Sequence, residues 1–215
     1  MRIKNALVYT VEHGFVERDV RIKNGCFAGS EAAGTDGEEI LDAGGDYLIP
    51  GLVDIHFHGC AGHDFSDGTP EALQAIGAYE LRQGVTSICP ASMTLSEETL
   101  KTVCANAYAY TKRPEAEQDT GARLIGIHLE GPFISMEAQN PAYIRNPDVE
   151  MFLRLQEAAH GLVRLITIAP ETDGAKEFIR RLADQVHISV GHTCSDYETA
   201  YRAFSQGADH VTHFF

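Results

Sequence analysis

From residue 51 onward, short apolar runs alternate with longer amphipathic runs, and this alternation is what most constrains the fold. The apolar runs are nearly continuous, which is typical of strands buried on both faces of a parallel sheet. The amphipathic runs between them indicate crossover helices, so the pattern predicts an α/β fold. The expected strands are 52–58, 84–91, 124–130, 163–169, 187–191 and 210–215, and the expected helices are 70–83, 96–112, 148–160, 174–184 and 195–206.

A (β/α)8 TIM-type barrel needs eight strands and eight helices, typically in about 250 residues. About six of the eight strands are expected in residues 51–215, so this domain is predicted to be a barrel that is incomplete at its C-terminus. An enzyme that ended there would expose a parallel edge with its apolar face uncovered. We therefore expect the chain to be a piece of a longer protein, or a partner to supply the missing quarter.

Residues 1–50 follow a different rhythm. Short runs at 3–9, 16–22, 26–28, 40–43 and 47–49 are separated by turn signals, among them Asn24-Gly25. This pattern predicts a small antiparallel β unit. Because about 50 residues make a poor independent core, the unit is expected to lean on another part of the protein.

The chain is acidic, with a formal charge of -14 from 17 basic and 31 acidic residues. Nucleic acid and anionic membranes need a basic face, so both are excluded as expected partners, whereas a small anionic substrate is not. No apolar run approaches the ~20 residues of a membrane span. The N-terminus has no signal-peptide core, so we expect a cytoplasmic protein.

The stretch Gly51–Gly59, GLVDIHFHG, places a carboxylate and two imidazoles two residues apart, at Asp54, His56 and His58. In an extended strand these three side chains would point to the same face. Two such histidines at a strand end can hold a metal ion. H-x-H is a short motif, however, and on its own it fits a core strand with internally hydrogen-bonded histidines equally well.

Further polar residues stand at the ends of the other predicted strands. In a β/α barrel these ends converge on one mouth, where active sites lie. Imidazole and carboxylate are ligands of zinc and similar divalent ions, so the spacing predicts a divalent metal site. The chain has no G-x-S-x-G elbow, G-x-G-x-x-G or P-loop that would support another chemistry. The strand-end residues are His56, His58, His128, Glu130, His192 and His213.

Several segments together resemble the amidohydrolase superfamily and, within it, the N-acetylglucosamine-6-phosphate deacetylase family. They are GLVDIHFHG, HGCAGHDF, GVTSICPAS, HLEGPFIS, GHT and THFF, and they span the chain. HLEGPF is the most specific, because most of the superfamily has a carboxylated lysine where this family has Glu130. The resemblance implies a metal-bearing barrel flanked by a urease-like β-sandwich, to which residues 1–50 would contribute the N-terminal part. It also implies hydrolysis of the acetamide of N-acetylglucosamine 6-phosphate, and pairing as a homodimer.

The same resemblance assigns roles to residues. Glu130, His192 and His213 would hold the main ion, and His56 with His58 would hold a second ion, as in two-ion members. Zinc is favoured, and iron also suits these ligands. Gln139 matches a sugar-binding position, and the catalytic aspartate is expected beyond residue 215. The piece is therefore expected to be inactive alone.

The chain departs from the family in one loop. The family usually has a basic, glycine-containing insert after GPFIS, whereas here residues 136–141 follow directly, so the loop is shorter or residues are missing.

Two alternatives stay open at this point. One is another amidohydrolase of the dihydroorotase, deaminase or D-aminoacylase type. The other is a catalytically incomplete metal-binding fragment.

Overall fold

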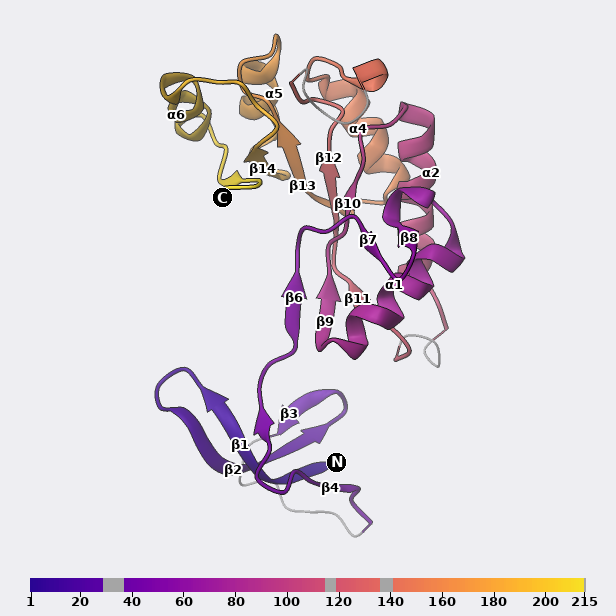
Figure 1. Cartoon of the computed structure of the whole chain (residues 1–215), viewed down its shortest axis with the longest axis vertical. Coiled ribbons are helices and arrows are strands. Elements are labelled where there is room, and N and C mark those ends of the chain that lie inside the picture. Colours follow the sequence, from indigo (N-terminus) through magenta and orange to yellow (C-terminus); the bar gives the residue numbers. More distant parts are fainter. Residues whose placement is uncertain (29–36, 115–118, 136–140, 215) are drawn as a thin grey trace. The chain divides into compact units, whose positions relative to one another are not determined.

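The computed structural model describes residues 1–28, 37–114, 119–135 and 141–214. The chain divides into two compact units, Met1–Gly51 and Leu52–Phe215 (Figure 1). None of the helices in the described part is both long and apolar enough to cross a membrane.

The first unit is one mixed sheet. Its strands are β1 (Arg2–Thr10), β2 (Gly14–Lys23), β3 (Cys26–Ala28), β4 (Ile40–Asp42) and β5 (Tyr47–Leu48). The turn at Asn24-Gly25 joins β2 to β3 with positive φ at both residues, as expected for an Asn-Gly hairpin. The antiparallel prediction holds for β1 to β3 but is wrong for β4 and β5, which pair parallel with β1. Strand patterns in a sequence do not specify this long-range pairing.

The second unit is built on parallel strands. A three-stranded sheet has the order β11-β9-β6, and a five-stranded sheet has the order β10-β12-β13-β14-β15. Figure 1 shows β6, β9 and β12 running in the same direction, with α1, α2 and α4 on one side. The strands are β6 (Leu52–Asp54), β9 (Val85–Ile88), β10 (Ala91–Ser92), β11 (Arg123–Leu124), β12 (Ile127–Glu130), β13 (Val163–Ile168), β14 (His187–Val190) and β15 (His210–Val211), with a small hairpin of β7 (Gly59–Cys60) and β8 (His63–Asp64).

All five predicted crossover helices are present. Four of them begin at a side chain that accepts a backbone N–H of the first turn, which satisfies a group that helix geometry leaves unpaired: Thr69, Ser96, Asp148 and Asp196. The helices are α1 (Pro70–Arg82), α2 (Glu97–Thr111), α4 (Val149–Ala158), α5 (Ala175–Leu182) and α6 (Tyr197–Ser205), with the short turns η1 (Phe65–Asp67) and η2 (Pro141–Tyr143).

The core lies between the parallel strands and these helices. Phe133, Phe152 and Phe178 are fully buried, and their rings pack edge to face. Leu129 on β12 is also fully buried. Each such side chain contributes about 1.5–3 kcal/mol through burial. This packing fixes β12, and hence the position of the next residue, Glu130.

The first strand is shorter than predicted. β6 ends at Asp54, not at residue 58, because the Asp54 carboxylate accepts a hydrogen bond from the His56 backbone N–H at 3.0 Å. This local turn competes with strand pairing. His56 and His58 therefore lie in the segment after the strand. Similarly, β15 ends at Val211, so His213 follows it.

Candidate metal centre

Glu130 is the centre of the candidate site. It is the last residue of β12, two positions after His128 and directly after the core residue Leu129. Side chains alternate along a strand, so Glu130 and His128 share the face opposite Leu129. Only 3% of Glu130 is exposed. A buried carboxylate needs compensating partners, and here these partners are imidazoles.

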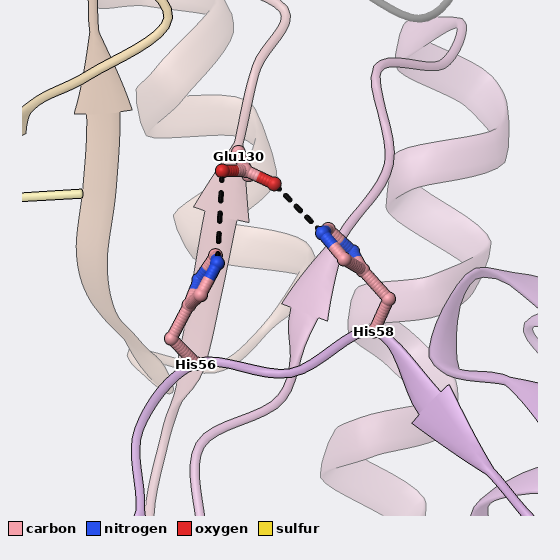
Figure 2. A group of neighbouring side chains, drawn as sticks. All are labelled: His56, His58 and Glu130. Carbon is pink, nitrogen blue, oxygen red and sulfur yellow. Dashed lines mark ion pairs between the residues drawn. The ribbon is translucent and has the colours of Figure 1, made fainter. Parts of the chain in front are cut away.

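Four histidines from three further strand ends surround this carboxylate. His58 Nε2 lies 2.8 Å from Glu130 Oε2, and His192 Nε2 lies 3.0 Å from Oε1. His213 and His56 place their Nε2 atoms 3.2 and 3.8 Å from Oε1. Figure 2 shows His56 and His58 approaching the two oxygens of Glu130 from the segment after β6. We call these five residues the Glu130 cluster.

The backbone around the histidines directs their rings inward. The Ala91 carbonyl lies 3.1 Å from His58 Nδ1, which leaves Nε2 of His58 facing the carboxylate. His192 and His213 adopt left-handed φ values of 49° and 53°. Such values are uncommon outside glycine and cluster at functional sites. The His192 carbonyl also accepts a hydrogen bond from Ser135 N–H at 2.9 Å.

The electrostatics favour an ionised Glu130 carboxylate. Burial opposes ionisation of Glu130, but the hydrogen bond from His58 and the nearby His192 and His56 lower the pKa of Glu130 to about 2. The hydrogen bond to Glu130 raises the pKa of His58. Burial lowers the pKa of His56 and, more strongly, that of His128, to about 3.

The donor set fits a divalent ion. Tetrahedral zinc with ligands at about 2.0–2.2 Å separates its ligand atoms by about 3.3–3.6 Å. The contacts of Glu130 with His58, His192 and His213 span 2.8 to 3.2 Å. Every ion-pair partner that the described part of the chain gives Glu130 is a histidine. Two overlapping triads have their ligand atoms within 4.8 Å of one another, and both contain Glu130: one with His56 and His58, and one with His192 and His213.

The other predicted residues take different places. Gln139 lies outside the described residues. His128 is not part of either triad; its Nδ1 lies 3.1 Å from Nδ1 of His56 and its Nε2 lies 2.7 Å from Thr167 Oγ1. Sequence reasoning missed Thr167, because a single hydroxyl within a strand is ordinary and gives no signal of its own.

Sequence reasoning also missed Glu171, which follows β13. Its carboxylate accepts the Cys194 backbone N–H at 2.7 Å and the Thr193 hydroxyl. Both partners come directly after His192, so Glu171 holds the segment that carries His192. A glutamate in a loop gives no sequence signal for such a role.

A second group of histidines gathers at the opposite ends of β14 and β15. Asp209 Oδ2 lies 2.6 Å from His187 Nδ1, and Asp209 Oδ1 lies 2.8 Å from His210 Nδ1. Neither histidine was among the candidate ligands predicted from the sequence. We call these three residues the Asp209 cluster; they are exposed to solvent to a large extent.

Comparison with known proteins places this geometry in a family. The model of the amidohydrolase family matches residues 47–215. The chain belongs to the amidohydrolase family. Its fold is accordingly of the TIM-barrel type found in that family.

Sugar-phosphate deacetylases are among the proteins to which the chain is similar. N-acetylglucosamine-6-phosphate deacetylase of Bacillus subtilis (strain 168) is 37% identical over 182 residues, which are 83% of this chain and 46% of the relative. N-acetylgalactosamine-6-phosphate deacetylase of Escherichia coli O157:H7 is 28% identical over 207 residues, 94% of this chain and 53% of the relative. The chain spans about half the length of the curated relatives it matches.

The chain is also similar in structure to a solved sugar-phosphate deacetylase. It is an Asp-to-Ala mutant of N-acetyl-D-glucosamine-6-phosphate deacetylase from Mycobacterium smegmatis, in complex with N-acetyl-D-glucosamine-6-phosphate. The TM-score is 0.83 at 29% identity, and the match covers 100% of this chain and 55% of the solved one.

Proposed function

We propose that the full-length protein hydrolyses the acetamide of N-acetylglucosamine 6-phosphate to glucosamine 6-phosphate and acetate. The observation that carries this proposal is the buried Glu130 carboxylate facing four imidazoles, within the HLEGPF segment. Deacetylases acting on this sugar phosphate are among the similar proteins. They give no support to the dihydroorotase-like, deaminase-like and D-aminoacylase-like alternatives.

The Glu130 cluster is proposed to hold one or two divalent ions, zinc in preference to iron. His192 and His213 would bind with Glu130 Oε1, and His58 with His56 would bind on the side of Oε2. When bound, such an ion polarises the amide carbonyl and makes a water molecule more acidic. The protein supplies ionised Glu130 and imidazole lone pairs aimed at one point, without reorganisation during the reaction.

Proton transfer is proposed to fall to an aspartate beyond residue 215. The nearby carboxylates of the described chain have other tasks, because Glu130 is surrounded by histidines and Asp54 accepts the His56 backbone N–H. Substrate capture by an Asp-to-Ala mutant of the Mycobacterium smegmatis protein supports this assignment. Gln139 is proposed to contact the sugar.

The remaining expectations form part of the same proposal. Residues 1–50 would be the N-terminal part of a small β-sandwich domain, and residues 51–215 the larger part of the metal-dependent hydrolase barrel. The full-length protein would be a cytoplasmic homodimer acting on a small amino-sugar phosphate. The acidic charge of -14 supports the exclusion of nucleic acid and anionic membranes.

Acetate release tests the activity. The full-length gene product is incubated with N-acetylglucosamine 6-phosphate, N-acetylgalactosamine 6-phosphate, and a panel of dihydroorotate, hydantoin and N-acyl-D-amino-acid substrates. We expect turnover of the glucosamine derivative first, loss of turnover with a chelator, and recovery with zinc. Turnover of only a panel substrate would assign a different hydrolase, and turnover that survives complete metal removal would overturn the metal centre.

The 215-residue chain provides a second test. We expect it to bind metal but to release no acetate, because it holds the metal cradle without the proton-transferring aspartate. Robust deacetylation by this chain would show that the base lies within residues 1–215.

A further inference from the structure

A continuous row of polar side chains runs through the interior of the second unit from the metal centre. His56 Nδ1 lies 3.1 Å from His128 Nδ1, and His128 Nε2 lies 2.7 Å from Thr167 Oγ1. Thr167 Oγ1 lies 2.9 Å from Thr212 Oγ1, which lies 2.6 Å from Ser189 Oγ. The last four members are all buried. We call these five residues the polar row.

We propose that the polar row couples the tautomer of His56 to the order of its own hydrogen bonds, and that His128 is a positioning residue for the ion held by His56 and His58. This inference rests on the proposed metal centre. It adds that selection of the ion-binding form of His56 depends on groups deep inside the barrel, none of which contacts the ion.

Metal binding by His56 determines where each hydrogen of the polar row lies. An imidazole that binds a metal ion through Nε2 must carry its hydrogen on Nδ1. Nδ1 of His56 then donates to Nδ1 of His128, which must be an acceptor, so His128 carries its own hydrogen on Nε2. That hydrogen is donated to Thr167. Each later hydroxyl accepts from the previous group and donates to the next, so the order runs from His56 towards Ser189.

The opposite order of hydrogen bonds in the polar row prevents His56 from binding the ion. If Ser189 donates to Thr212 and each group passes its hydrogen in that direction, His128 accepts at Nε2 and donates from Nδ1. His56 must then accept at Nδ1 and carry its hydrogen on Nε2, where no lone pair remains for an ion. Because every member has one hydrogen to place, the other tautomer of His56 keeps all four hydrogen bonds only if the whole row reverses. Hydrogen-bond partners of this kind set the ring orientation of metal-binding histidines.

The threonines are held in the orientation that the row requires. A Cβ added at Gly191 would lie 2.7 Å from Thr212 Cβ and 2.9 Å from Thr167 Cγ2. The absence of a side chain at Gly191 thus lets both threonines pack against the backbone with their carbon atoms. Their hydroxyls are left to meet each other.

The test compares four variants of the full-length protein by metal content and affinity. His128→Phe keeps a ring but removes both nitrogens, Thr167→Val removes one hydroxyl from the row, and His128→Gln restores one acceptor and one donor. Ser92→Ala is the matched control, because Ser92 is a buried hydroxyl of β10 to which the structure gives no hydrogen-bond partner. Zinc content after dialysis against a zinc buffer is the first readout.

We expect His128→Phe to weaken one of two ions about 10- to 100-fold and to leave the other in place. Thr167→Val should weaken the same ion to a smaller extent, His128→Gln should recover most of the loss, and Ser92→Ala should change neither ion. A purely structural role would lower thermal stability without choosing between the ions. Wild-type affinity for both ions in His128→Phe and Thr167→Val would overturn this inference but not the proposed metal centre.

The second readout is the tautomer itself. Long-range 1H–15N spectra of protein labelled with 15N-histidine show which ring nitrogen carries hydrogen. We expect the zinc-loaded wild type to show His56 protonated at Nδ1 and His128 at Nε2. The opposite assignment of His128 would overturn the inference while leaving the metal centre intact. A wild-type protein without an ion at His56 would instead overturn the metal proposal there, and this inference with it.

Discussion

The two ends of β14 and β15 carry clusters built from the same residue types in different surroundings. The carboxylate of the Glu130 cluster is 3% exposed and comes from a different strand than its histidines. The carboxylate of the Asp209 cluster is 45% exposed and lies next in sequence to one of its histidines. Similar distances within the two clusters therefore do not indicate similar function.

The difference lies in what each carboxylate already does. Asp209 Oδ1 accepts the Ile188 backbone N–H at 3.2 Å as well as His210, so it holds the start of β14. Exposed pairs of this kind contribute about 0–1 kcal/mol and are screened by salt. Glu130 is compensated by imidazole nitrogens in a buried setting, where an unpaired charge is costly. The buried Glu130 carboxylate therefore depends on its histidine partners more strongly than the exposed Asp209 carboxylate does.

The largest expected effect separates the two carboxylates. Glu130→Gln should lower zinc affinity by more than about 100-fold at both positions, because even substitutions outside the ligand shell cost 10- to 100-fold. Asp209→Asn should leave zinc content unchanged. Zinc bound per chain, measured on the full-length protein by elemental analysis, checks both. Equal losses in the two variants would contradict the distinction drawn between the clusters.

The same substitution at two histidines, one at each end of β14, should affect zinc binding differently. His192→Asn removes one ligand of the triad on Glu130 Oε1 and should cost about 100-fold for one ion while the ion on the His58 side remains. His187→Asn, at the other end of the same strand, should cost nothing. Calorimetric titration with zinc resolves the two ions. Loss of zinc in His187→Asn would show that the Asp209 cluster also binds metal.

The proximity of the side chains in the Glu130 cluster was predictable from the sequence for a specific reason. His192, His213 and Glu130 each follow an apolar run, and the ends of parallel strands meet at one mouth. The early end of β6 was not predictable from periodicity, because it depends on the Asp54 carboxylate bonding to the backbone. The Asp209 cluster was missed for a similar reason, since its pairing appears only when β14 and β15 lie side by side.

The polar row was also invisible in the sequence. Thr167 and Ser189 are the single hydroxyl residues of β13 and β14, and one such residue in a strand is ordinary. Their role depends on the register that brings Thr167 opposite Ser189. Sequence patterns place residues near the ends of strands, but they do not show which side chains of neighbouring strands contact each other.

An effect of intermediate size is expected in the pH dependence of stability, where His128 and Asp209 should act differently. Burial holds the pKa of His128 at about 3 in the folded protein, against an ordinary value of 6.5. Below pH 6.5 the unfolded chain therefore binds a proton that the folded chain refuses, and stability falls by up to about 1.4 kcal/mol per pH unit down to about pH 3. In metal-free protein, His128→Gln should flatten this slope between pH 6.5 and 5.

The pKa of Asp209 shifts for the opposite reason, because its ionised form is stabilised in the folded protein. Burial opposes its ionisation, but the hydrogen bonds from His187 and His210 lower the pKa of Asp209 overall. Its contribution is present above the ordinary aspartate pKa and is lost as the pH falls through the lower folded value. Asp209→Asn should therefore leave the slope between pH 6.5 and 5 unchanged. Urea unfolding at a series of pH values measures both slopes, and parallel slopes for wild type and His128→Gln would sink this prediction.

The smallest expected effect concerns two carboxylates that both hold backbone at a strand end. Glu171 accepts the Cys194 backbone N–H and the Thr193 hydroxyl directly after His192, whereas Asp209 does the same for Ile188 far from Glu130. Glu171→Ala should free the segment that carries His192 and weaken one ion by up to about 10-fold, the lower limit for groups that support a ligand. Glu171→Gln retains an acceptor oxygen and should recover part of this loss. Asp209→Ala should leave zinc affinity unchanged, so an equal loss in Asp209→Ala and Glu171→Ala would mean that loosening either strand end disturbs the centre.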